Sequence, residues 1–195
     1  MTHGGNPTEH SDGRRAKGER RRREIIDATL RVIERDGIAG VSHRNIAREA
    51  GVPPASIVYY FESIDGVLIA ALLESCETMI AELRELTEQV VDDPEGWVTA
   101  TAEMLSRMVR EQRGRTLAEY ELYLLAARRP ALRPAARRWI EVATGYVHDT
   151  GTSDTGAVRA LPAAIDGLLM QALIAEEPPG PEEFRPVLAH LVPER

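Results

Sequence analysis

The residues with the clearest binding chemistry lie in the run VSHRNIAREAGVPPASIVYYF, residues 41–61. A helix over the first part of this run turns Ile46 and Ala47 inward, and Gly51 ends it in the left-handed conformation that glycine tolerates. Pro54 then suits the first turn of a second helix, where its missing N–H costs little. This spacing predicts a helix-turn-helix, whose second helix enters the major groove of DNA, although an ordinary helical hairpin has the same pattern.

Basic residues just before this run favour DNA over a plain hairpin, because they are close enough in sequence to reach phosphates beside a docked helix. They are Arg14, Arg15, Lys17, Arg20, Arg21, Arg22 and Arg23. Within the run, Arg44 has a planar fork that grips guanine with two hydrogen bonds or contacts a phosphate. Tyr59 and Tyr60 add hydroxyl donors suited to phosphate.

The periodicity of apolar residues predicts the helices that position these side chains. A first helix from about Glu19 to Asp36 ends at Gly37, and a fourth helix begins after a Ser63 cap and continues to about residue 91. The inward face of the first helix consists of Ile25, Ala28, Thr29, Val32 and Ile33. Further helices are predicted at about 95–112, 115–128, 131–149, 157–176 and 181–192. We find no convincing strand, so the predicted fold is all-α with about nine helices.

The charge of the chain is distributed unevenly. The formal net charge of −7 looks unsuitable for a protein that binds DNA. Residues 1–62, however, hold 11 Lys and Arg against 9 Asp and Glu, a balance of +2, whereas the remainder holds 13 against 22, a balance of −9. This asymmetry is expected when only one end of the chain meets phosphate.

The first third of the sequence resembles the TetR family of one-component bacterial repressors, most closely over about residues 20–70. The matching elements are the helix REIIDATLRVIERDG, the S-x-R-x-I-A pattern from Ser42, the A-G-V run from Ala50, the Tyr60-Phe61 pair and the helix led by Ser63. The start of the chain is polar and rich in glycine and histidine, which predicts a disordered basic arm over residues 1–18. The resemblance implies a helix-turn-helix DNA-binding domain over 19–64 and a ligand-binding and dimerisation domain over 65–195.

The resemblance also implies which residues meet DNA. Arg44 reaches a base or a phosphate, the start of the second helix faces bases, and the tyrosines make phosphate and apolar contacts. The expected DNA-binding residues are Arg21, Ser42, His43, Arg44, Pro54, Ala55, Ser56, Tyr59 and Tyr60. Two positions depart from the family pattern: Val58 stands where a tyrosine is common, and Ile64 replaces a lysine that usually braces the fourth helix against phosphate.

A two-fold dimer is expected, because two copies of the module read two half-sites of a palindromic operator. Apolar stripes in the last two predicted helices form either this interface or plain core, and the family's four-helix dimer bundle favours the interface. The stripes consist of Leu161, Ile165, Leu168, Leu169, Ala172 and Leu173, followed by Val187, Leu188 and Leu191.

Family members usually bind a small molecule among their central helices, and its binding moves the fourth helix so that the operator is released. Thioethers and amphipathic rings suit an apolar or amphipathic effector, although each is individually more typical of core. The expected pocket residues are Met79, Met104, Met108, Tyr120, Glu121, Tyr123, Trp139 and Met170. Glu121 shares a predicted helical face with Leu117, Leu124 and Leu125, so it either meets a cationic ligand or pairs with an arginine.

Nothing in the sequence indicates an enzyme. It has no nucleophile elbow, P-loop, dinucleotide fingerprint or metal-ligand spacing of His and Cys, so we expect no catalysis, cofactor or metal. Its one cysteine, the absence of a long apolar run and its polar N-terminus favour the cytoplasm and no membrane insertion. The alternative to a ligand-released repressor is an architectural or partner-controlled DNA-binding protein.

Overall fold

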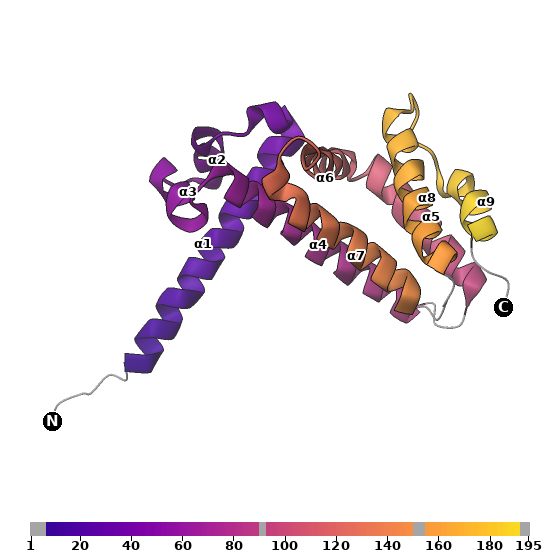
Figure 1. The fold of residues 1–195 in the computed structure, drawn as a ribbon, viewed down its shortest axis with the longest axis horizontal. Coiled ribbons are helices and arrows are strands. Elements are labelled where there is room, and N and C mark those ends of the chain that lie inside the picture. Colours follow the sequence, from indigo (N-terminus) through magenta and orange to yellow (C-terminus); the bar gives the residue numbers. More distant parts are fainter. Residues whose placement is uncertain (1–6, 90–92, 150–154, 192–195) are drawn as a thin grey trace. The chain divides into compact units, whose positions relative to one another are not determined.

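A computed structural model describes residues 7–89, 93–149 and 155–191. Within these ranges the chain forms nine α-helices and two short 3-10 helices, with no strand (Figure 1). The all-α prediction is therefore confirmed. The chain divides into two compact units, Met1–Ala71 and Leu72–Arg195, and the division falls within α4 (Ile64–Gln89) rather than after residue 64, where the sequence placed it.

The first unit contains α1 (Pro7–Asp36), the short 3-10 helix η1 (Ile38–Gly40), α2 (His43–Ala50), α3 (Pro54–Phe61) and the start of α4. Helix α1 begins at Pro7 rather than near Glu19, so the described part of the expected disordered arm is helical. Residues 14–24 are rich in good helix formers, and each residue added to an existing helix gains a hydrogen bond without a new nucleation cost. Residues 1–6 of the expected arm lie outside the described residues.

One face of α1 forms the core of the first unit, as its periodicity predicted. All five residues of the predicted inward face are buried, and Ile26 joins them. The one polar member, Thr29, donates its hydroxyl to the Ile25 carbonyl oxygen at 2.8 Å, so no buried donor is left unsatisfied there. Ile46 and Ala47 of α2 and Ile57 and Phe61 of α3 complete this core.

The second unit contains the rest of α4 and five further helices that follow the predicted ranges closely. They are α5 (Pro94–Arg110), α6 (Arg113–Leu125), α7 (Arg133–Asp149), α8 (Thr155–Ile174) and α9 (Pro181–Leu191), with the 3-10 helix η2 (Pro130–Leu132) before α7. The predicted end of the fourth helix near residue 91 lies outside the described residues. Helices α5 and α9 pack along each other, and so do α7 and α8.

No single helix among the described residues is long and apolar enough to cross a membrane. Helix α3 and the adjoining part of α4 meet the length and composition criteria only when taken together, and they are bent by 71° at the break between them.

We expect Gly51→Ala to lower the free energy of unfolding by about 1 kcal/mol, because a side chain disfavours the left-handed backbone. Gly51 ends α2 at φ 64° and ψ 36°, and a Cβ atom there would meet nothing within 4 Å, so the cost is that of backbone conformation alone. Urea unfolding of the purified protein measures the change. Gly18→Ala, in the helical backbone of α1 and equally open, is the control, and it should leave stability equal or higher. An equal loss in both variants would contradict the argument.

Candidate nucleic-acid interface and ligand cavity

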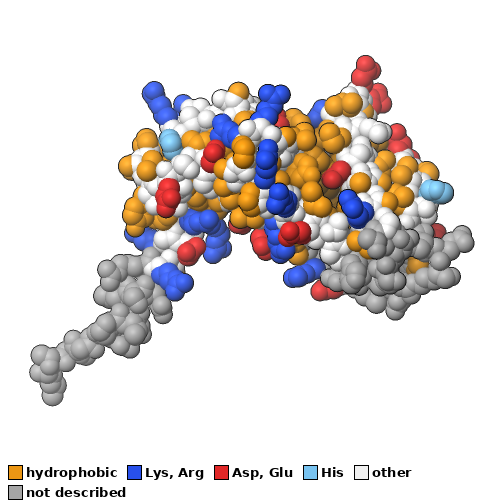
Figure 2. Space-filling view, viewed as in Figure 1, with side chains coloured by type: hydrophobic (Ala, Val, Ile, Leu, Met, Phe, Trp, Pro, Cys, Tyr) orange, Lys and Arg blue, Asp and Glu red, His pale blue; other side chains and the backbone are white. Residues whose placement is uncertain are grey.

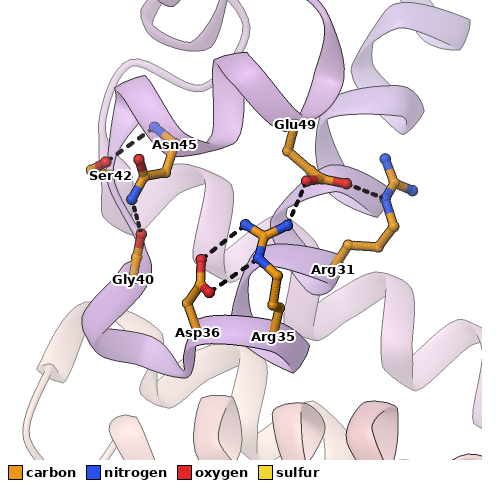
Figure 3. Close-up of polar contacts among 7 residues, drawn as sticks. All are labelled: Arg31, Arg35, Asp36, Gly40, Ser42, Asn45 and Glu49. Atoms are coloured by element: carbon orange, nitrogen blue, oxygen red, sulfur yellow. Dashed lines mark hydrogen bonds and ion pairs between the residues drawn. The ribbon is translucent and has the colours of Figure 1, made fainter.

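Helix α2 is fixed at both ends by hydrogen bonds that its sequence supplies. The Ser42 hydroxyl accepts a hydrogen bond from the Asn45 backbone N–H at 3.1 Å, which caps the start of the helix. The Asn45 side chain in turn donates to the Gly40 carbonyl oxygen at 2.7 Å (Figure 3). At the other end, the Val52 N–H bonds to the Ala47 carbonyl oxygen at 2.9 Å across the left-handed Gly51.

An ion-pair network joins α1 to α2 on the opposite side (Figure 3). The two carboxylate oxygens of Glu49 accept hydrogen bonds from Arg31 and Arg35, each at 2.8 Å. Arg35 also forms two hydrogen bonds to its neighbour Asp36, at 3.0 and 2.8 Å. The hydrogen bond from Arg31 is the main reason that the pKa of Glu49 lies below its ordinary value. Glu49 therefore stays charged and holds α2 against α1.

Helix α3 has one buried side and one side that faces outward. Ile57 and Phe61 are buried beneath it, while Val58 and Tyr59 on the other side are 50% and 80% exposed. Arg22 of α1 lies with its guanidinium carbon 5.1 Å from the centre of the Phe61 ring, which fixes one of the basic side chains beside this helix. Helices α2 and α3 with the turn at Gly51 thus have the form of the predicted helix-turn-helix.

The predicted DNA-binding residues are not equally available for contact. Arg44, Pro54, Ala55 and Tyr59 are exposed, while Ser56 and Tyr60 are partly covered. Three have other roles or constraints: the Ser42 hydroxyl is occupied by the helix cap, the His43 Nε2 atom is buried, and Arg21 is paired with Glu24 at 2.9 Å. Sequence reasoning left out Val58, although its position next to Tyr59 indicated an outward side chain.

The second unit contains a cavity of about 90 Å³ among α4, α5, α6, α7 and α8. Five of the eight predicted pocket residues line it: Met79, Met104, Met108, Tyr120 and Trp139. The other three do not. Met170 is exposed, Tyr123 packs against Trp139 with ring centres 6.4 Å apart, and Glu121 lies outside the lining. The volume is below the roughly 300 Å³ of a typical drug-sized pocket, so a larger ligand would have to displace the flexible methionines.

The acid that enters the cavity from α6 is Glu119, and the choice of Glu121 was wrong. Leu117 and Leu124, which were expected to mark the buried face of α6, are exposed at 42% and 51%. The apolar residues of α6 itself lie on several sides of the helix, and Figure 2 shows hydrophobic side chains at the surface over it. Their periodicity alone therefore could not identify the buried side. Glu119 accepts a hydrogen bond from Arg115 at 3.1 Å, and burial raises its pKa.

Asp166 of α8 is a second acid of the cavity, and sequence reasoning did not interpret it. Its carboxylate accepts a hydrogen bond from the Tyr120 hydroxyl at 2.8 Å, and its pKa is raised by burial. No ion pair to Asp166 occurs among the described residues, in contrast to the Glu119–Arg115 pair. The signal that could have identified it is its place in the apolar stripe with Ile165 and Leu169, both of which also line the cavity.

Two buried hydroxyls also line the cavity. Ser75 of α4 and Thr101 of α5 are 1% and 2% exposed. The Ser75 hydroxyl faces Glu119 and opposes the rise in the pKa of that carboxyl, whereas the Thr101 oxygen has no hydrogen-bond partner within the described residues. Because an unpartnered buried hydroxyl is costly, the Thr101 oxygen indicates a space that is filled by water or by a polar ligand atom. The described residues contain no group of three His, Cys, Asp or Glu positioned to hold a metal ion.

The predicted dimer-interface residues lie mostly in the core of the second unit. Leu161, Leu169, Ala172, Leu173 and Leu188 are buried, and Ile165, Leu168 and Leu191 pack against the same core. Val187 is the exposed member, at 39%. The stripes identified from the sequence are therefore the inner faces of α8 and α9, whose apolar residues pack against α5 and the cavity.

Both parts of the sequence match known protein families. Residues 25–71 match the family described as bacterial regulatory proteins, tetR family, and residues 92–194 match the tetracyclin repressor-like C-terminal domain. The transcriptional regulator PksA of Bacillus subtilis is 44% identical over 54 residues, which cover 28% of this chain and 26% of PksA. The nicotine-responsive repressor HdnoR of Paenarthrobacter nicotinovorans is 33% identical over 115 residues, or 56% of each chain. The chain thus spans about a quarter and about half of these two relatives.

Among solved structures, the multidrug binding protein EbrR in complex with imidazole has a TM-score of 0.76 and 38% sequence identity, covering 90% of this chain and 92% of EbrR. EbrR has also been solved in complex with ethidium and with proflavin. The exposed helix-turn-helix, the lined cavity and these matches over both parts of the sequence lead to one conclusion: the chain belongs to the TetR family of helix-turn-helix transcriptional regulators.

Proposed function

We propose that this protein is a cytoplasmic repressor that binds a palindromic operator as a homodimer. It is released from the operator by a small cation whose body is mainly hydrocarbon. The observation that carries the proposal is the combination of an outward α3 in one unit with, in the other, a lined cavity whose Asp166 carboxylate has no ion pair among the described residues. The first binds DNA and the second detects the signal.

The DNA-binding side rests on exposed residues at the start of each helix of the motif. In a helix-turn-helix, the first residues of the second helix point toward base edges. Pro54 and Ala55 occupy these positions in α3, and Tyr59 lies one turn further on. Arg44 near the start of α2 is exposed and has no ion pair within the described ranges, so its guanidinium is available for a guanine or a phosphate.

The dimer interface that we propose is the outer face of α8. Ala163, Gly167, Met170 and Ile174 recur at spacings of four, three and four along this helix, which places them in one stripe. Met170 and Ile174 are 44% and 84% exposed, and a Cβ atom at Gly167 would meet nothing within 4 Å. Small residues at the centre of an apolar stripe allow two helices to approach closely. Val187 of α9 adds an exposed apolar side chain.

The charge of the cavity supports a cationic effector. Three carboxylates line it, on Glu82, Glu119 and Asp166, against the single guanidinium of Arg115. Glu119 is already paired with Arg115, whereas the only polar partner of Asp166 among the described residues is the neutral Tyr120 hydroxyl. A cation bound at Asp166 would compensate a partly desolvated charge. The aromatic compounds bound to EbrR and the nicotine named for HdnoR are consistent with an apolar, nitrogen-containing effector.

Helix α4 is the element through which we expect the signal to pass. It begins directly after α3, with Ser63 accepting a hydrogen bond from the Gly66 N–H at 3.0 Å as a cap. Further along, Ser75, Met79 and Glu82 of the same helix line the cavity. A ligand that displaces these side chains shifts α4, and it favours the state in which the two α3 helices no longer match successive major grooves.

In vitro selection from random duplexes is expected to recover an inverted repeat whose half-sites lie about one helical turn apart. Arg44→Ala should lose base preference at one position per half-site and weaken binding by about 5- to 150-fold for each half-site, the range for one lost bidentate base contact, with the two losses multiplying in the dimer. Gel shift with the selected duplex measures the change. Ile174→Glu, on the proposed dimer face, should instead yield a protein that is monomeric in sedimentation. This monomer should protect single half-sites of the duplex rather than the whole inverted repeat. Uniform coating without a selected sequence would contradict the proposal and favour an architectural protein.

Benzyltrimethylammonium is a suitable probe of the cavity, with the uncharged benzyl alcohol as its counterpart. We expect the cation to raise the melting temperature of the DNA-free protein, equivalent to about 2.7 kcal/mol at a hundredfold excess over its Kd, and to release the selected duplex. Choline chloride at the same concentration controls for ionic strength. A larger effect of benzyl alcohol, or release by choline chloride alone, would exclude a site selective for an aromatic cation.

Asp166→Asn should stabilise the ligand-free protein at neutral pH by up to about 1 kcal/mol, since functional carboxylates are often held at a cost in stability. Burial raises the pKa of Asp166, so the folded state binds its proton more tightly than the unfolded state, and the ionised form opposes folding above both pKa values. The gain should disappear in urea unfolding below about pH 3.9. Glu119 and Glu82 are present in both proteins, so their contributions cancel in the difference between the two unfolding free energies. Glu103→Gln on the exposed face of α5 is the control, with no change expected.

A further inference from the structure

The outward face of α3 consists mainly of hydrocarbon. Ala55, Val58 and Tyr59 point away from the buried Ile57 and Phe61. Val58, a branched apolar side chain, is 50% exposed at the middle of this face, and Tyr59 is 80% exposed beside it. Figure 2 shows hydrophobic side chains at the surface over α3. Within the first unit, burial does not explain these side chains, because they lie on the side opposite its core.

The same helix has little capacity to read bases by hydrogen bonds. Its sequence, PASIVYYF, contains no Arg, Lys, Asn, Gln, Asp or Glu, the residues with the best-defined hydrogen bonds to base edges. Pro54 has no N–H, and the N–H of Ser56 is already bonded to the Pro53 carbonyl oxygen at 2.9 Å. The Ser56 hydroxyl is partly covered. Glu62 follows the helix at its C-terminal end, away from the first turn that faces bases in this motif.

The tyrosine ring on this face is held in place. The rings of Tyr59 and Tyr60 lie with their centres 4.9 Å apart and their planes at 88°, an edge-to-face contact. Tyr59 therefore presents a supported apolar ring next to Val58, and only the hydroxyl at its tip is polar. Such a surface binds tightly where it meets another apolar group.

The major groove offers one apolar group on its base edges, the C5 methyl group of thymine. We propose that α3 recognises its operator through contacts of Ala55, Val58 and Tyr59 with thymine methyl groups. Residues three or four apart on a helix have Cβ atoms about 5–6 Å apart, and base pairs are spaced about 3.4 Å apart, so these three side chains cover about two or three consecutive pairs. This readout rests on the proposed function, because it requires a sequence-specific DNA-binding protein.

The proposal is tested on the duplex selected with the full-length protein, whose half-sites should each contain two or more thymines within three consecutive pairs. Each of these thymines is then replaced by uracil, which keeps the O4 acceptor and the pairing and lacks only the methyl group. One lost methyl contact corresponds to about a fourfold loss of affinity, and the same replacement in both half-sites to about sixteenfold. Uracil at thymines outside the half-sites should change nothing.

Val58→Ala separates the direct contact from any effect of uracil on the duplex itself. The wild-type protein should bind the duplex with thymine at the contacted position about four times as tightly as the duplex with uracil there. For the Val58→Ala variant this ratio should approach one. Alanine preserves the helix, and the replaced side chain is half exposed, so an unchanged melting temperature verifies the fold. Leu117→Ala, at an exposed position of α6, is the matched control and should retain the fourfold ratio.

Two results would overturn the readout while leaving a sequence-specific regulator intact: selected half-sites without clustered thymines, or uracil replacements that cost nothing at every position. A ratio that stays at four in the Val58→Ala variant would assign the methyl effect to the duplex and would overturn it as well. If no sequence is selected at all, the proposed function fails, and the readout fails with it.

Discussion

The left-handed turn at Gly51 is the constraint on which the first unit depends. It ends α2 after its eighth residue and reverses the chain, and the Val52 N–H closes the turn on the Ala47 carbonyl oxygen. Pro53 and Pro54 then restrict the backbone so that α3 starts immediately, with Ile57 and Phe61 directed into the core. Because that face is buried, Val58 and Tyr59 on the other side must be exposed. The surface proposed to meet DNA is thus a consequence of how one helix ends.

The second unit is organised by an opposite requirement, which is to keep polar groups inside an apolar wall. Among the described residues, the buried Thr101 hydroxyl has no hydrogen-bond partner, Ser75 is buried beside Glu119, and Asp166 accepts a hydrogen bond from the neutral Tyr120 hydroxyl. A core selected only for stability would replace such groups with hydrocarbon, since unsatisfied buried polar atoms are costly. The second unit also pairs Glu119 with Arg115 within the same helix, which compensates the charge of one acid of the cavity, whereas Asp166 has no ion pair among the described residues.

The sequence predicted the first unit well because the relevant signals are local. The Ser63 cap, the Gly51 turn and the inward face of α1 each depend on residues within one or two turns of each other, and the structure confirms them. The cavity depends on tertiary packing. Five of the predicted aromatic and thioether residues line it, but the acid that α6 contributes to the lining is Glu119 rather than the predicted Glu121, because apolar residues occur on several sides of α6 and periodicity alone marks no single face.

Because periodicity does not reveal tertiary packing, the apolar stripes of the last two helices could not be assigned from the sequence. A stripe shows that a helix face is covered, but it does not show whether the cover comes from the same chain or from a second copy. In α8, Leu161 and Leu169 pack into the core of the unit. The less conspicuous stripe of Ala163, Gly167 and Ile174 remains outside, and it was overlooked because small residues contribute little to a hydrophobic pattern.

Pro162 gives α8 a further property. It lies within the helix and lines the cavity, yet it cannot donate the backbone hydrogen bond that every other residue type supplies at that position. The first turns of α8 are therefore coupled to the rest by fewer bonds than elsewhere along the helix, and bending there is easier. The cavity wall at Pro162 is therefore the part of α8 that bends most easily when the volume of the cavity changes.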